Sequence, residues 1–159
     1  MSRKGPTKPR KTEPDAICNS ELLGKIINFS MKNGKKLATQ KQVYSALDLL
    51  SKKGKKEALA LVEQAIENIK PKVEVRPRRI GGAVYQVPRP VSSRRQLSLS
   101  IRWLVNSARA RPNKQYRTFG EKLAAEITSA LENEGSAINK KLEVEKMAEA
   151  NKAFSHLRW

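Results

Sequence analysis

Residues 72–88 read KVEVRPRRIGGAVYQVP, and the character of the chain changes at this stretch. Apolar residues alternate with charged or polar ones on both sides of Gly81-Gly82, as they do in paired β-strands. The glycine pair supplies the backbone freedom that a turn requires. Pro77 lacks a backbone donor, which confines its strand to the edge of a sheet. We therefore predict a β-hairpin over residues 72–88, which must pack on helices or on a partner because a lone hairpin is marginal in water.

The segments on either side of the hairpin have helical periodicity. Apolar residues recur there every three or four positions, which indicates helices with one buried face. Ser20 is a good N-cap, and Asn33-Gly34, Gly54 and Pro71 interrupt the pattern. We expect six helices, over about residues 20–33, 36–52, 56–69, 93–111, 119–132 and 138–154. In the last helix the apolar residues are Leu142, Met147, Ala150 and Phe154. The fold class is therefore mainly α, a single domain with a basic β-hairpin between the third and fourth helices.

The length of 159 residues fits one domain, with a tail before it. Residues 1–15 carry five cations and three prolines and show no apolar period. Such a segment cannot bury enough surface to order alone. We interpret residues 1–15 as a flexible basic arm that orders on a phosphate backbone, with a solubilising tail as the alternative, and residues 16–159 as the helical domain that includes the hairpin.

The charge balance points to a polyanionic partner. The chain has 33 Lys and Arg against 15 Asp and Glu, a net charge of +18. So large a charge destabilises a compact state through self-repulsion. Nucleic-acid phosphates are the first candidate to offset it, and an anionic membrane surface is the second. No apolar run approaches the ~18 residues of a membrane span.

The positive charge is concentrated in one region. Residues 75–120 contain no Asp or Glu but hold ten of the thirteen arginines and Lys114. Arginine binds phosphate through a planar fork of donors and stacks on bases. Arg95, Arg102 and Arg109 recur every seven residues, which places them on one ridge of the expected helix, away from its apolar stripe. This spacing favours a helix docked on phosphates, with Trp103 either stacking nearby or packing on the hairpin.

The sequence does not provide the parts of a catalytic or metal site. His156 is the only histidine, and Cys18 has no base beside it, so neither fits a nucleophile–base pair. Glu143, Glu145 and Glu149 fit a polar helix face better than a general acid and base. We therefore expect a protein that is not an enzyme and needs no metal or cofactor.

Two other classes of binding protein are alternatives to an RNA-binding protein. Architectural DNA-binding proteins also combine helices with basic β-arms. They usually act as small dimers, whereas this chain is long enough to fold alone and shows no extra dimer seam. A membrane-surface protein needs a spare apolar helix face, which the arginine-bearing helix does not have.

Several short blocks of sequence are not specific singly, but together and in this order they are specific to one family. They are Asn33-Gly34-Lys35-Lys36, then RRIGGAVYQVP at residues 78–88, Ile101-Arg102-Trp103-Leu104, MAEANKAF at residues 147–154, His156 and Arg158-Trp159. From Ser20 onward the chain resembles the family of small-subunit ribosomal protein seven.

The resemblance implies a structural role in the small ribosomal subunit. The family binds the three-prime major domain of small-subunit ribosomal RNA and helps to nucleate assembly of the subunit head. It faces messenger RNA and exit-site transfer RNA, next to ribosomal protein eleven of the same subunit. The family occurs in the bacterial cytoplasm and in plastids and mitochondria, so the compartment stays open.

Charge pattern and resemblance together give a set of candidate RNA-binding residues. The resemblance contributes the positions in the tail, in the loop around Lys35 and Lys36, in the hairpin and on the arginine-bearing helix. The full set is Arg3, Lys4, Lys8, Arg10, Lys11, Lys25, Lys35, Lys36, Arg76, Arg78, Arg79, Tyr85, Gln86, Arg94, Arg95, Arg102, Trp103, Arg109, Arg111, Lys114 and Arg117.

The chain departs from the usual family pattern in three places. Glu145 stands where the family usually has histidine, and residues 112–119 form a longer segment than is usual in bacteria. The tail matches only in being basic.

Overall fold

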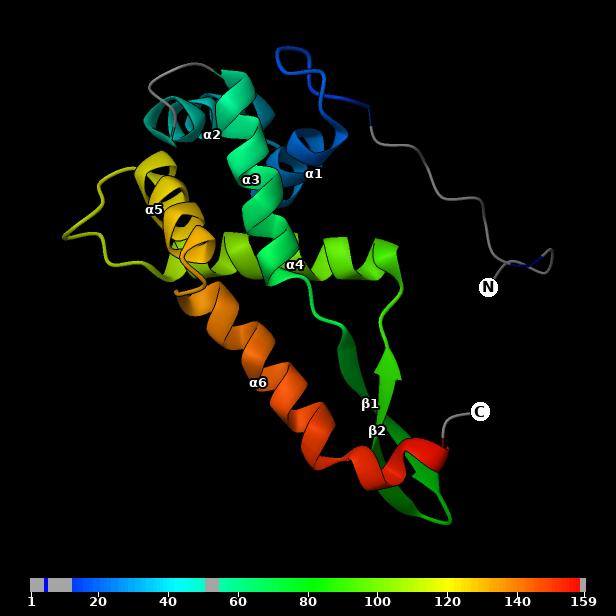
Figure 1. Ribbon diagram of the computed structural model, residues 1–159. Helices are drawn as coiled ribbons and strands as arrows, with labels where there is room; N and C mark the ends of the chain where they lie inside the picture. Colours follow the sequence, from blue (N-terminus) through cyan, green and yellow to red (C-terminus); the bar gives the residue numbers. More distant parts are fainter. Residues whose placement is uncertain (1–4, 6–12, 51–54, 158–159) are drawn as a thin grey trace.

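The computed structural model describes Gly5, residues 13–50 and residues 55–157. In these residues six α-helices, one antiparallel hairpin and a final 3-10 helix follow one another. The elements are α1 (Glu21–Ser30), α2 (Lys36–Leu50), α3 (Lys55–Ile69), β1 (Val73–Ile80), β2 (Ala83–Pro90), α4 (Ser93–Ala110), α5 (Phe119–Leu131), α6 (Ser136–Ala150) and η1 (Lys152–Leu157). The mainly helical fold, with a hairpin between the third and fourth helices, is confirmed. Figure 1 shows the hairpin projecting from the helical body, with α6 leading down toward it.

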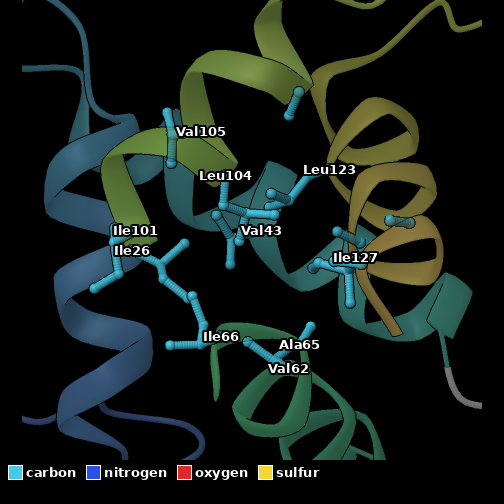
Figure 2. Packing of buried hydrophobic residues seen from close by; sticks show 14 of the residues in the cluster. Ile26, Val43, Val62, Ala65, Ile66, Ile101, Leu104, Val105, Leu123 and Ile127 are labelled. Atoms are coloured by element: carbon cyan, nitrogen blue, oxygen red, sulfur yellow. The ribbon is translucent and has the colours of Figure 1, made fainter. Parts of the chain in front are cut away.

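The core lies where α5 packs against α2, α3 and α4. Figure 2 shows side chains from these helices and from α1 converging there. The labelled residues are Ile26, Val43, Val62, Ala65, Ile66, Ile101, Leu104, Val105, Leu123 and Ile127, all at most 2% exposed. Full burial of one such Val, Leu or Ile side chain contributes roughly 1.5–3 kcal/mol. The apolar residues that recur at helical spacing in α1 to α5 therefore form the buried faces of these helices.

Gly120 lets α5 approach α2 closely. A Cβ atom at this position would lie 2.8 Å from the backbone oxygen of Gln42, so a larger residue would force the helices apart. The Gly120 N–H also donates to Oε1 of Gln42 at 3.0 Å. α5 begins with a capping box formed by Thr118 and Glu121. The backbone N–H of Arg117 donates to Glu121 at 2.8 Å, and this hydrogen bond is the main cause that lowers the pKa of Glu121.

Asp15 attaches the chain before α1 to α2. Its carboxylate accepts hydrogen bonds from the N–H groups of Ile17 and Cys18, and the hydroxyl of Tyr44 donates to it at 2.6 Å. Burial, together with this hydrogen bond to a carboxylate, raises the pKa of Tyr44 to about 12. Asp15 is 5% exposed, so this last residue of the predicted arm is packed with the helical domain.

The hairpin projects from the helical body and is packed by α6 and by η1. Its register pairs Val73 with Pro90 and Ile80 with Ala83, so the second strand continues two residues past the predicted end. Gly81 and Gly82 form the turn with φ of +56° and +89°, angles that side chains other than glycine rarely adopt. α6 packs on both strands and η1 packs on β2. The expectation that the hairpin needs helices beside it is thus met at its base.

The prediction for the last helix was wrong in two respects. α6 ends at Ala150, and Phe154 lies in η1. Leu142 and Met147 are 55% and 43% exposed rather than inward, and Ala148, which lies beside the hairpin, is buried instead. The apolar pattern of this helix is too weak to identify its buried side, because that side is set by the close approach of the hairpin. The predicted end of the second helix falls partly on residues 51–54, outside the described residues.

Candidate nucleic-acid interface

The hairpin displays part of the predicted RNA-binding set. Arg79 and Gln86 are exposed near its tip, and Arg78 is half-buried. Tyr85, paired with Arg78 in the register, packs against Phe154 with ring centroids 5.3 Å apart and planes tilted by 56°. Part of the Tyr85 ring is therefore covered by η1, and this contact packs the C-terminal segment against the projecting end of the hairpin.

A buried glutamate organises the arginines at the base of the hairpin. Glu74 is 7% exposed, and its two carboxylate oxygens accept from Nε of Arg76 at 2.8 Å and Nε of Arg95 at 2.6 Å. Burial by itself would raise the pKa of Glu74, but the hydrogen bonds from Arg95 and Arg76 outweigh it and lower that pKa. Arg89 lies opposite Glu74 in the register and lines the same hollow. One carboxylate thus binds two guanidinium groups, from β1 and α4, and the hollow beside it is also lined by Arg89 of β2.

The predicted arginine ridge of α4 divides into exposed and engaged residues. Arg102 is exposed, and Arg95 is exposed but paired with Glu74. Arg94, beside the ridge, is also exposed. Arg109 is half-buried and donates from Nη2 to the backbone oxygen of Ser30 at 2.9 Å. Trp103 is half-buried against the hydrophobic core, so packing accounts for much of its surface. The ridge therefore offers separate charges rather than one uniform stripe.

Arg111 is the predicted RNA-binding residue that the structure engages most fully inside the protein. Its Nε donates to Glu126 at 2.7 Å, and its Nη2 donates to Oγ of Ser129 at 2.8 Å and to the backbone oxygen of Ala125 at 3.2 Å. Its guanidinium also lies 5.5 Å from the centre of the Tyr116 ring. Glu126 is 1% exposed and accepts a second hydrogen bond, from the N–H of Ala137. Arg111 therefore connects α4, α5 and α6, and we assign it a structural role.

The remaining described candidates lie in loops and on α1. Lys35 and Lys36 are exposed where α2 begins, and Lys114 and Arg117 are exposed between α4 and α5. Lys25 on α1 lies 3.8 Å from a carboxylate one turn earlier. The predicted contacts in the arm lie outside the described residues; they are Arg3, Lys4, Lys8, Arg10 and Lys11.

Three glutamates position this basic surface, and sequence reasoning gave none of them that role. Glu74 precedes the acid-free window and alternates with Val73 and Val75, which is a signal that could have placed it on the arginine face. Nothing in the sequence identifies Glu126 as the partner of a residue fifteen positions away in another helix. Glu145, the departure from the family pattern, accepts from the N–H of Lys72 at 3.1 Å and so ties α6 to the start of β1.

Neither a metal site nor a membrane span is found in the described part of the chain. Within it, no group of three or more His, Cys, Asp or Glu side chains could hold a metal ion. None of its helices is both long enough and apolar enough to cross a membrane.

Comparison with known proteins accounts for this combination of helices and basic hairpin. The model of the family described as ribosomal protein S7p/S5e matches residues 2–152. The small ribosomal subunit protein uS7 of Caldicellulosiruptor saccharolyticus is 52% identical over 159 residues, covering all of both chains, and that of Sulfurihydrogenibium sp. is 50% identical with the same coverage. The uS7 protein of Thermosipho melanesiensis is 52% identical over 150 residues, covering 94% of this chain and 95% of its own. The chain therefore belongs to the ribosomal protein S7 family, and it is a structural, non-enzymatic constituent of a bacterial-type small ribosomal subunit.

Proposed function

We propose that this protein binds the three-prime major domain of small-subunit ribosomal RNA through the hairpin, α4 and the loops beside α4. One observation carries the proposal: residues 75–120, which build this surface, contain eleven cations and no acid. Arg79, Arg94, Arg102, Lys114 and Arg117 are exposed on it. A surface of this composition attracts phosphates, because residues 75–120 contribute no negative side chain that would repel them.

The physical basis of this binding is the exchange of counterions for protein cations. Each phosphate that a Lys or Arg neutralises releases a condensed counterion from the nucleic acid, which makes affinity salt-dependent. Arginine adds a bidentate geometry that lysine lacks. Glu74 favours this geometry because it fixes Arg76 and Arg95 through Nε, which leaves their terminal nitrogens for a phosphate.

Family membership and the shape of the molecule support a finer role. By binding this RNA domain, the protein assists assembly of the subunit head and lines the region of messenger RNA and exit-site transfer RNA. It lies beside ribosomal protein eleven there. The projecting hairpin supports this role, because a ribbon that extends from a compact body can reach RNA at a distance from the main docking surface (Figure 1).

The test of this function compares two nucleic acids at one salt concentration. Binding of the full chain to a transcript of the three-prime major domain is measured against mixed-sequence duplex DNA at ~0.15 M salt. Non-specific binding should have a Kd of about 10⁻⁴ to 10⁻⁶ M. The transcript should bind at least roughly a thousandfold more tightly. Equal and weak binding of both would overturn the proposal and favour an architectural DNA-binding protein.

A pair of variants tests which surface makes the contacts. The double variant Arg94→Gln/Arg102→Gln removes two exposed charges from α4, and Lys41→Gln/Lys146→Gln removes two exposed charges from α2 and α6 as the matched control. Since each phosphate contact contributes about 0.9 to the slope of log K against log salt, the α4 variant should flatten that slope by roughly 1–2. The control should leave the slope nearly unchanged, and equal flattening in both variants would contradict a docking surface on α4.

A further inference from the structure

We infer that α6 and η1 hold the projecting hairpin at a fixed angle to the helical body, with Glu145 and Phe154 as the positioning residues. Figure 1 shows α6 leaving the helical body and converging on the hairpin, with η1 against the projecting part of the hairpin. The contacts agree with this view, because α6 packs on both strands and η1 packs on β2. The inference rests on the proposed RNA binding and deepens it by naming residues that act through the hairpin rather than by touching RNA.

The first contact lies at the base of the hairpin. Lys141 of α6 donates from Nζ to the backbone oxygen of Asn68, at the end of α3, at 2.8 Å. One turn later on α6, the carboxylate of Glu145 accepts from the N–H of Lys72 at 3.1 Å. The backbone oxygen of Lys72 in turn accepts from the N–H of Val91 at 3.1 Å. The chain that enters the hairpin and the chain that leaves it are therefore both linked to Glu145 through Lys72.

The second contact joins Phe154 of η1 to Tyr85 of β2. The ring centroids are 5.3 Å apart and the planes are tilted by 56°, which is a favourable arrangement for two aromatic rings. Tyr85 pairs with Arg78, six residues after Lys72. At about 3.3–3.4 Å per residue, this contact lies ~20 Å from the one at Glu145. Two contacts this far apart can fix a direction, whereas a contact at the base alone cannot.

The hairpin and α6 are separated over part of their length by a cavity of about 610 Å³. Pro88 and Pro90 line it from the hairpin, and Ala148 and Lys152 are among the residues that line it from the other side. A rotation of roughly 15° at the base would move a point ~20 Å away by about 5 Å, which is more than the length of a hydrogen bond. Because the cavity leaves room for such a rotation, the direction of the hairpin depends on the contacts of Glu145 and Phe154.

The direction of the hairpin affects RNA binding because Arg79 and Gln86 are exposed near its tip. When only a fraction of the molecules holds the hairpin in the binding direction, the apparent Kd rises by the inverse of that fraction. A fall of this fraction to about one fifth therefore weakens binding about fivefold, although no residue that contacts RNA has changed.

The first experiment measures the direction of the hairpin in the absence of RNA. Residual dipolar couplings of the backbone amides are recorded for the full chain in a stretched, uncharged gel, since a chain with a net charge of +18 would bind anionic alignment media. In the wild type the hairpin and α1–α5 should fit a single alignment tensor. Phe154→Ala should reduce the couplings of residues 76–87 and leave those of α1–α5 unchanged.

The matched control is Leu142→Ala, which shortens an exposed apolar side chain of α6 and should change neither set of couplings. Three outcomes would overturn the inference. They are a wild-type hairpin that does not fit the common tensor, undiminished hairpin couplings in Phe154→Ala, and an equal reduction in Phe154→Ala and Leu142→Ala.

A second pair of variants tests the contact at the base. Glu145→Gln keeps an oxygen that can accept the hydrogen bond from the N–H of Lys72, so its hairpin couplings should match those of the wild type. Glu145→Ala removes the acceptor and should reduce them. Equal couplings in the two variants would contradict the role of Glu145.

The third experiment links the direction of the hairpin to RNA affinity through a double-mutant cycle. Phe154→Ala should raise the Kd for the ribosomal RNA transcript about fivefold, and Arg79→Gln should also raise it. Arg79→Gln should have a smaller effect in the Phe154→Ala background than in the wild type, because a hairpin of variable direction has already lost much of the contact made by Arg79. An unchanged Kd in Phe154→Ala, or two effects that simply multiply, would show that Phe154 does not act through the hairpin.

The inference and the proposed function can fail separately. If the wild-type chain does not prefer the transcript over duplex DNA, the proposed function fails, whereas the dipolar couplings are recorded without RNA and still report on the hairpin. If the transcript is preferred but Phe154→Ala leaves the hairpin couplings undiminished, the function stands and the inference fails.

Discussion

Replacing Arg111 with glutamine would leave the carboxylate of Glu126 buried without its guanidinium partner. Arg111→Gln removes the ion pair at 2.7 Å and the hydrogen bonds to Ser129 and to the backbone of Ala125. The side chains of Arg111 and Glu126 are 20% and 1% exposed, so water cannot fully replace what is lost. We therefore expect this variant to be destabilised, although the same residue type on the exposed face of α4 is dispensable for the fold.

The size of the effect follows from burial. Removing one partner of a buried pair costs about 3–5 kcal/mol, because the remaining charge has no compensation. The partial exposure of Arg111 places this case near the lower limit, at about 3 kcal/mol. For a domain of this length each kcal/mol lowers the Tm by about 2–4 °C, so the Tm should fall by roughly 6–12 °C. Arg102→Gln, on an exposed residue of α4, should change stability by less than about 0.5 kcal/mol.

Urea unfolding followed by circular dichroism measures these differences, and the double variant Arg111→Gln/Glu126→Gln identifies their cause. A glutamine at position 126 still accepts the hydrogen bond that the N–H of Ala137 now gives to Glu126, but it carries no charge. The double variant should therefore recover at least about half of the stability that Arg111→Gln loses. A single variant Arg111→Gln as stable as the wild type, together with a clear flattening of the RNA salt slope, would refute the structural role and restore Arg111 to the RNA interface.

Two further predictions concern the fold. The pKa of Tyr44, raised to about 12, means that the folded state favours the neutral phenol; the stability that Tyr44 contributes should be complete below pH ~10 and lost as the pH rises toward 12. Urea unfolding between pH 8 and 12 should therefore show the wild type losing its advantage over Tyr44→Phe, and a constant difference would contradict the bond to Asp15. Leu104→Ala should cost about 2–5 kcal/mol by leaving a cavity among α1–α5, and a loss below 1 kcal/mol would show that the core closes around it.

The helices and the hairpin could be predicted because their signals are local. Ser20 was predicted as a cap, and its side chain accepts from the N–H of Leu23 at the start of α1. The apolar residues of α4 recur at helical spacing, and two of them, Ile101 and Leu104, are completely buried. Gly81-Gly82 marked the turn, since glycine readily adopts the positive φ angles found there. Each of these features depends on residues within about a turn or a hairpin of one another.

The organisation of the charges could not be predicted, because it depends on contacts between distant segments. Residues 75–120 contain eleven cations, and nothing in the sequence separates those that are paired inside the protein from those that are not. The fold makes them different by bringing up acids from outside the window: Glu74 binds Arg76 and Arg95, and Glu126 binds Arg111. Both acids lie within a few residues of the ends of the acid-free segment. Counting charges locates these ends but does not show which arginines the acids bind.

This division of the cations explains how a chain with a net charge of +18 can fold despite the repulsion among its cations. The arginines closest to the packed helices carry internal partners, which reduces the repulsion that a basic core would suffer. The exposed residues Arg79, Arg94, Arg102, Lys114 and Arg117 are in no ion pair among the described residues, so their charge is available to a polyanion. The number of cations in residues 75–120 is therefore about twice the number of exposed charges that lie outside any ion pair of the described residues. The variants that distinguish stability from RNA affinity are those that compare one arginine of each kind.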